Sequence, residues 1–136
     1  MLQLVYISTS REVLDPQVLD HILTVSRRNN AAAGVTGLLL SGGRRFLQAL
    51  EGPEDKVRAT YERIFGDPRH FAIVELSRRE IASRQFGEWA MGYNAGGEAG
   101  QENDLRGVVR KLILPLTDRH LRAQFLGFAE IHARAA

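Results

Sequence analysis

The chain has 136 residues, of which 44% are hydrophobic and 25% are charged, and its formal net charge is +2. These values predict a globular protein with a single core, and they argue against a second catalytic domain and against long disordered tracts. Because the sequence contains no cysteine, disulfides, thiolate nucleophiles and cysteine-based metal sites are excluded, so redox chemistry would require a bound cofactor.

The sequence shows no sign of a membrane span or of an export signal. No apolar run approaches the roughly 18 residues of a membrane helix, and the N-terminal MLQLVYIS opens as a strand without a basic region or a cleavage site. We therefore expect a cytoplasmic protein with no membrane partner. Nucleic acid binding is not expected either, because no basic stripe alternates with aromatic residues.

The first predicted element is a strand over residues 2–8, LQLVYIS. Side chains alternate between the two faces of a strand, so one face carries Leu2, Leu4 and Tyr6, and the other carries Gln3, Val5 and Ile7. Both faces are mostly apolar, which indicates that other elements cover both sides of the sheet.

A helix is predicted to follow this strand. Asp15 and Pro16 mark its start, as an N-cap residue followed by a first-turn proline. Residues that are four, seven or eight positions apart lie on the same face of a helix. Polar residues at this spacing therefore continue the apolar stripe. This face carries Val18, Ile22, Ser26, Asn29 and Asn30. We expect the helix to end near the asparagine pair.

Residues 34–52, GVTGLLLSGGRRFLQALEG, predict a β-hairpin with a Gly-Gly turn. On its second arm Phe46, Gln48 and Leu50 share one face, which places a primary amide between two apolar neighbours. Burying an amide without a partner costs about 1–3 kcal/mol, so Gln48 requires a polar group to bind.

A second helix and a further strand are predicted to follow the hairpin. Pro53, followed by two acidic residues, predicts the helix start, and Gly66 predicts its end. The expected apolar stripe of this helix consists of Val57, Tyr61, Ile64 and Phe65. The loop DPRH then leads into a strand over residues 71–82.

The order strand, helix, strand, strand, helix, strand predicts an α+β fold of the ferredoxin-like βαββαβ type, with two helices on one face of the sheet. The run EWAMGY, residues 88–93, predicts an added fifth strand, and a glycine-rich linker follows it. Two C-terminal helices are expected over residues 101–114 and 118–134, the second capped by Asp118. We expect them to cover the other sheet face through Leu105, Val109, Leu112, Ile113, Leu121, Phe125, Phe128 and Ile131.

Polar residues gather on the side of the sheet that the first two helices cover. The first and third strands are neighbours in this topology, so Tyr6 and Gln48 could be neighbours as well. Arg69 and His70 follow the second helix, at the end of the sheet where the asparagine pair lies. Singly, each residue has an ordinary structural role, such as a helix cap or a turn residue. Together they suit a flat heteroaromatic ligand whose edge carries carbonyls and ring nitrogens.

The sequence resembles the BLUF family, the blue-light sensors that bind FAD. The resemblance lies in LVYIS, SRRNN with the following GVTGLLL, FLQALEG, DPRH and EWAMGY, which span residues 2–93 in the order of the family. It implies a flavin-binding domain over residues 1–95 and a C-terminal helical extension over residues 96–136 packed on the sheet, as in short stand-alone members. It also implies FAD as the cofactor, whereas the residues themselves leave FMN as an alternative.

The family pattern implies a role for each matching residue. Tyr6 would be the photochemical electron donor and Gln48 the switching amide between it and the flavin. Asn30, with Asn29 beside it, would hold the carbonyl and ring-nitrogen edge of the flavin. The other implied contacts are Ile22 and Ile64 on the ring faces, Ser26 close by, Arg69 and His70 at the far carbonyl and the cofactor's side chain, and Trp89 and Met91 as alternative neighbours of Gln48.

The resemblance implies a photoreceptor and not an enzyme. Electron and proton transfer from Tyr6 would rearrange the hydrogen bonds of Gln48, and the fifth strand would signal to the C-terminal helices and to a protein partner in trans, with a homodimer left open. Two alternatives come from other classes: an acylphosphatase-like small hydrolase, and a non-photoactive ligand-binding or dimerisation module. The hydrolase is disfavoured because LVYISTSREV lacks a glycine-rich phosphate loop.

Overall fold

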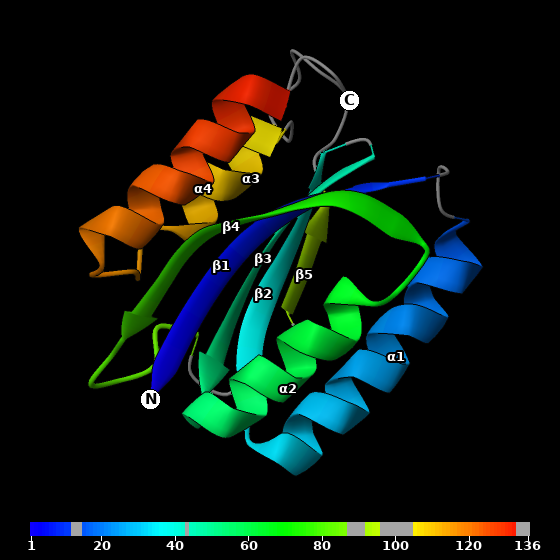
Figure 1. Cartoon of the computed structure of the whole chain (residues 1–136). Helices are drawn as coiled ribbons and strands as arrows, with labels where there is room; N and C mark the ends of the chain where they lie inside the picture. Colours follow the sequence, from blue (N-terminus) through cyan, green and yellow to red (C-terminus); the bar gives the residue numbers. More distant parts are fainter. Residues whose placement is uncertain (12–14, 43, 87–91, 96–104, 133–136) are drawn as a thin grey trace.

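The computed structural model describes residues 1–11, 15–42, 44–86, 92–95 and 105–132. In chain order, its elements are β1 (Leu2–Ser10), α1 (Pro16–Ala33), β2 (Thr36–Gly42), β3 (Arg45–Gly52), α2 (Glu54–Phe65), β4 (His70–Glu80), β5 (Gly92–Ala95), α3 (Leu105–Leu112) and α4 (Arg119–His132). One sheet lies at the centre, with α1 and α2 on one face and α3 and α4 on the other (Figure 1). None of the described helices is both long enough and apolar enough to cross a membrane.

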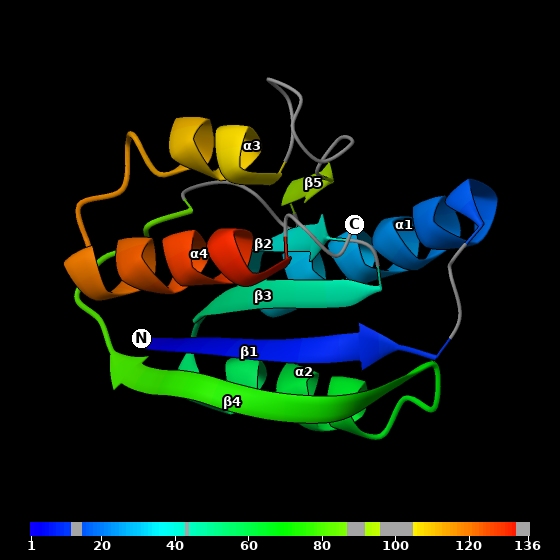
Figure 2. The same ribbon diagram turned by 90° about the horizontal axis from the view of Figure 1, so that it is seen from above.

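The strands of the sheet follow the order β4-β1-β3-β2-β5 (Figure 2). The first four pair antiparallel, and β5 pairs parallel with β2. The predicted ferredoxin-like arrangement with an added fifth strand is therefore confirmed. The fifth strand itself spans Gly92–Ala95 instead of 88–93, and residues 88–91 lie outside the described part of the chain.

Each sheet face covers a separate apolar core, as the alternation along the strands predicts. The core under α1 and α2 contains Leu2, Leu4, Tyr6, Leu23, Val35, Leu50 and Val57. The core under α3 and α4 contains Val5, Leu38, Leu40, Leu47, Ala49, Phe86, Val109, Ile113, Leu116, Leu121, Phe125, Phe128 and Ala129. The sheet thus separates two groups of helices that contact each other little.

Helix α1 starts as predicted but ends later. The Asp15 carboxylate accepts a hydrogen bond from the Gln17 N–H at 2.7 Å, which is the expected N-cap. At the other end the helix continues to Ala33, because three alanines favour helix and the left-handed Gly34, at φ 71°, supplies the stop. The asparagine pair therefore lies within the helix, and the predicted end at Asn29 and Asn30 is wrong.

Helix α2 buries a slightly different stripe from the predicted one. Val57 is fully buried, whereas Phe65 is 61% exposed. Eight residues after Val57, Phe65 is rotated by about 80° around the helix axis and leaves the buried face. Thr60 is buried instead, and its hydroxyl donates to the Lys56 carbonyl at 2.8 Å. The prediction that Phe65 belongs to the buried stripe is therefore wrong.

Helices α3 and α4 cover the second face, as predicted. Asp118 caps α4 by accepting a hydrogen bond from the Leu121 N–H at 3.1 Å. Phe125 is fully buried, whereas Ile131 is 69% exposed, so the prediction that Ile131 faces the sheet is wrong. Six residues beyond Phe125, Ile131 is turned by about 120° away from the buried side.

The contrast between Phe125 and Ile131 gives a test of α4 packing. Phe125 stacks on Phe86 with ring centroids 6.0 Å apart, and removing a buried aromatic side chain costs about 3–5 kcal/mol. We predict that Phe125→Ala lowers the free energy of unfolding by this amount in urea titrations followed by circular dichroism. The control Ile131→Ala should change it by less than about 0.5 kcal/mol. Equal losses in the two variants would contradict this packing.

Candidate functional site

A cavity of about 370 Å³ lies between the sheet and the helices α1 and α2. This volume is within the range of small-molecule sites, about 300–1,000 Å³. Its wall brings together nine of the residues singled out from the sequence: Tyr6, Ile22, Ser26, Asn29, Asn30, Gln48, Ile64, Arg69 and His70. Two others, Trp89 and Met91, lie outside the described residues.

The centre of the sheet-side wall is a pair of polar side chains. The antiparallel register of β1 and β3 places Tyr6 directly opposite Gln48. The Tyr6 hydroxyl donates a hydrogen bond to Oε1 of Gln48, and the two side chains are only 3% and 7% exposed. This bond satisfies the buried amide oxygen. Since a primary amide also carries two N–H donors, Gln48 can bind Tyr6 and a second group in the cavity at the same time.

The environment of Tyr6 keeps its phenol protonated. Burial raises the pKa of Tyr6 far above its ordinary value, and the nearby Tyr61 and Asp67 raise it further because they disfavour a second negative charge. The Tyr61 ring lies 5.3 Å from the Tyr6 ring, centroid to centroid, in a tilted arrangement. Tyr6 is therefore held as a neutral hydrogen-bond donor against the cavity.

Helix α1 supplies the opposite wall. Ile22, Ser26, Asn29 and Asn30 lie on one face of the helix and line the cavity. Asn30 is 2% exposed, so its amide is buried at the end of this wall. Because Gly34 terminates the helix, the two asparagine side chains are not needed as caps and face the cavity instead.

Charged groups gather where α2 ends and β4 begins. The Arg69 guanidinium pairs with Asp67, with Nε 2.9 Å from each carboxylate oxygen, and this contact holds the pKa of Asp67 below its usual value. The same contact raises the pKa of Arg69. His70 Nε2 lies 2.6 Å from the Ile64 carbonyl oxygen. Asp67 thus fixes the direction of Arg69, a role that the sequence did not reveal.

Further residues line the cavity that sequence reasoning missed. They are Ser8, Ser10, Leu19, His21, Leu23, Val25, Leu39, Phe46, Thr60, Arg63 and Asp67. Ser8 and Ser10 continue the alternation that starts at Tyr6, and Phe46 shares the face of Gln48. The alternation of side chains along the strands could therefore have identified these three residues. No comparable signal marks His21 or Arg63.

The donor set fits a flat heteroaromatic cofactor such as a flavin. Ile22 and Ile64 come from different helices and present aliphatic surface to the cavity, while the buried amides of Asn30 and Gln48 can pair with carbonyl and ring-nitrogen atoms. Among the described residues, no group of three or more His, Asp or Glu side chains is arranged to hold a metal ion. The site can therefore bind a ring system through amides and aliphatic contacts.

Comparisons with known proteins agree with this geometry. The family model described as BLUF, sensors of blue-light using FAD, matches residues 1–92. The blue light- and temperature-regulated antirepressor BluF of Escherichia coli (strain K12) is 39% identical over 88 residues, which cover 65% of this chain and 22% of that protein. This chain therefore spans less than a quarter of the relative.

Solved structures with a similar fold include BlrP1 and BlrB. Klebsiella pneumoniae BlrP1, in a complex with calcium and cyclic diGMP, gives a TM-score of 0.81 at 27% identity and covers 96% of this chain, which spans 34% of BlrP1. BlrB, a BLUF protein solved in its dark state, gives a TM-score of 0.69 at 27% identity, with 98% of this chain and 92% of BlrB covered. The similarity to BlrB extends over the C-terminal helices as well as the sheet.

The raised pKa of Tyr6 predicts a specific response to alkaline pH. A phenol whose pKa is higher in the folded protein stabilises it fully below about pH 10, and this contribution is lost as the pH rises toward the folded pKa. We predict that stability falls above about pH 10 and that Tyr6 ionises only with unfolding, as followed by tyrosinate absorbance and circular dichroism. Tyr6→Phe should remove this component. Ionisation of Tyr6 near its ordinary pKa in the folded protein would contradict the burial argument.

Proposed function

The chain belongs to the BLUF family of blue-light sensors that use FAD, and on that premise we propose that its cavity binds FAD and converts light absorption into a rearrangement of the Tyr6–Gln48 hydrogen bond. The observation that carries the proposal is this buried pair, which lies on the wall of a cavity of suitable size. As a BLUF domain, the chain is a light sensor and not an enzyme.

In this proposal, different cavity residues contact different parts of the cofactor. Asn30, with Asn29 beside it, would hold the carbonyl and ring-nitrogen edge of the flavin, and Ile22 and Ile64 would contact its two faces. Ser26 would lie close to the rings, and Arg69 and His70 would approach the far carbonyl and the cofactor's side chain. When bound, the flavin supplies blue-light absorption and an acceptor for one electron and one proton.

Tyr6 is suited to give up an electron and a proton together. Its buried phenol disfavours any charged form, so loss of the electron alone would leave a cation without solvation. Departure of the hydroxyl proton breaks the hydrogen bond to Gln48 Oε1. The amide, with one acceptor and two donor positions, can then settle in a different orientation when the proton returns.

The energy of this rearrangement is large enough to switch the protein. Each hydrogen bond contributes about 0.5–1.5 kcal/mol net, and a reorientation of Gln48 exchanges more than one bond. The resulting few kcal/mol are comparable to the free energy that separates two conformations of a protein with a populated minor state. One amide can therefore bias the position of the strands around it.

The output of the switch is also a proposal. We propose that Trp89 and Met91 exchange near Gln48, and that the fifth strand signals to the C-terminal extension, residues 96–136, and to a protein partner in trans. A cytoplasmic location and a homodimer remain predictions from the sequence. The hydrolase and the non-photoactive module are not favoured, because the family that the chain belongs to consists of light sensors.

The photochemical roles can be tested by absorption spectra before and after blue illumination. The FAD-loaded protein should show a small reversible shift of the flavin bands, which Gln48→Leu and Tyr6→Phe should abolish while FAD stays bound. Tyr61→Phe is the matched control, since this residue contacts the Tyr6 ring but does not line the cavity. It should keep the shift. A persistent shift in Gln48→Leu would refute the switching role.

The role of Asn30 can be tested by titrating the protein with FAD and following flavin fluorescence. Loss of the buried amide removes hydrogen bonds of about 1.4 kcal/mol in total, so we predict that Asn30→Ala raises the Kd for FAD roughly tenfold. Thr24→Ala, on the exposed side of the same helix, should leave the Kd unchanged. Equal affinities of wild type and Asn30→Ala would remove Asn30 from the binding site.

A further inference from the structure

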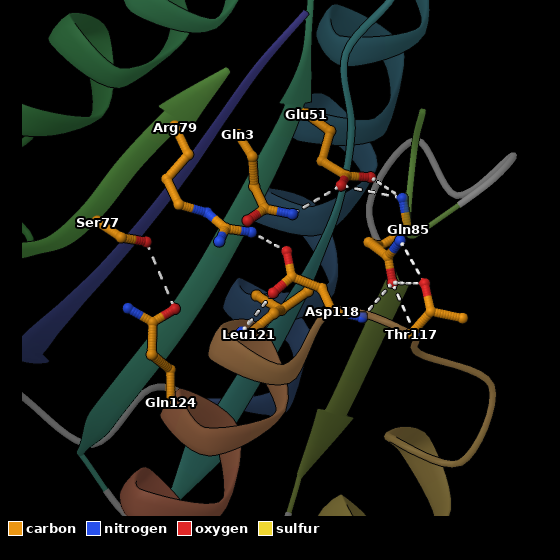
Figure 3. A network of polar contacts seen from close by, with 9 residues as sticks. All are labelled: Gln3, Glu51, Ser77, Arg79, Gln85, Thr117, Asp118, Leu121 and Gln124. Atoms are coloured by element: carbon orange, nitrogen blue, oxygen red, sulfur yellow. Dashed lines mark hydrogen bonds and ion pairs between the residues drawn. The ribbon is translucent and has the colours of Figure 1, made fainter. Parts of the chain in front are cut away.

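A buried carboxylate lies on the sheet face opposite the cavity. Glu51 follows Gln48 by three residues on β3, so its side chain projects to the other face, where it is 0% exposed. It accepts hydrogen bonds from Gln3 Nε2 at 3.0 Å and from the Gln85 N–H at 2.9 and 3.0 Å (Figure 3). It also accepts one from the Phe86 N–H at 2.9 Å. A buried carboxylate is costly unless hydrogen bonds compensate it, so these contacts account for its presence.

The residues that Glu51 holds form a connector, Arg84–Phe86, which lies between β4 and β5 in the chain. Arg84 donates hydrogen bonds to the Gly34 carbonyl at 2.7 Å, to Thr36 Oγ1 at 2.8 Å and to the Glu51 carbonyl at 3.0 Å. Phe86 belongs to the apolar core under α3 and α4 and stacks on Phe125 of α4. The connector is thus attached to the end of α1, to the sheet and to α4.

The middle residue of the connector reaches the start of α4. Gln85 Oε1 accepts hydrogen bonds from the N–H groups of Thr117 at 3.0 Å and Asp118 at 3.3 Å (Figure 3). Asp118 is the N-cap residue of α4, and its carboxylate also pairs with Arg79 of β4. The position of the first turn of α4 therefore depends on Gln85.

We propose that Glu51 and Gln85 are positioning residues that transmit a rearrangement at Gln48 to the N-terminus of α4; the inference rests on the proposed photochemical function. β3 carries both Gln48 and Glu51, and α1 carries Asn30 and is followed directly by its C-cap residue Gly34. Each element that supplies a cavity amide thus also supplies an anchor of the connector. Hydrogen bonds tolerate only narrow ranges of distance and angle. A small shift of β3 is therefore transmitted to the cap of α4 more strongly through hydrogen bonds than it would be through apolar contacts, which can slide.

Two buried polar atoms beside this network can take part in further hydrogen bonds. Gln3 Oε1 and Arg79 Nε are buried and have no hydrogen-bond partner among the described residues. They are an acceptor and a donor on residues that lie opposite each other on β1 and β4. A movement of Arg79 relative to Asp118 that brought these two atoms together would give both of them a hydrogen-bond partner.

The test compares hydrogen exchange in dark and light for the full FAD-loaded chain and its Gln85→Ala variant. The variant keeps both backbone N–H bonds to Glu51 and loses the side-chain contacts to the start of α4. We expect its light-induced flavin shift to match wild type, because Gln85 lies on the far side of the sheet from Tyr6 and Gln48. In the dark, exchange at the Thr117 and Asp118 amides should rise roughly tenfold, and the light–dark difference in residues 117–121 should disappear.

Gln124→Ala is the matched control. It truncates another glutamine that joins α4 to β4, through a contact with Ser77 Oγ at 3.4 Å, but it does not touch the connector. Its light–dark difference should equal that of wild type. A difference that persists in Gln85→Ala, or a wild type with a normal flavin shift and no difference in residues 117–121, would overturn the inference and leave the proposed function intact. A wild type without any flavin shift would overturn both.

Discussion

The hydrogen bond between Tyr6 and Gln48 helps to set the register of the two central strands, β1 and β3. An amide on an inward face needs a partner, and the β1–β3 register is the one that supplies a phenol opposite it. A slip of one residue would turn every side chain of the strand to the other face and would bury Glu51 against α1 and α2. The two apolar cores and the cavity therefore depend on a register that this buried polar pair helps to specify.

The sheet separates two groups of polar side chains, one on each of its faces. On one face, amides and a phenol line a cavity, and on the other a carboxylate gathers the connector and the start of α4. Gln48 belongs to the first group and Glu51 to the second, and both lie on one short stretch of β3. A rigid strand with different chemistry on its two faces is a simple means of relating a ligand site to helices that do not touch the ligand.

Charge is distributed unevenly around the cavity. Neutral hydrogen-bonding groups occupy its buried parts, where burial raises the pKa of Tyr6, whereas the Asp67–Arg69 pair lies in a more exposed position after α2. Burying neutral groups avoids the large desolvation cost of a charge, and this cost is smaller for an ion pair nearer to solvent. This distribution is consistent with a cofactor that has an uncharged ring system and a charged tail.

The order of the elements, the face of each strand and nine of the twenty residues that line the cavity follow from the sequence. Alternation and helical spacing depend on neighbouring residues in the chain, and together with the expected strand order these patterns are enough to place Tyr6 beside Gln48. The exposure of Phe65 and Ile131 follows from helical spacing, because they are turned by about 80° and 120° from the buried Val57 and Phe125. The end of α1 and the partners of Glu51 follow only from the folded chain. These depend on where a helix stops and which distant segments meet it, and a one-dimensional pattern contains no information about contacts between residues 34 positions apart, such as Glu51 and Gln85.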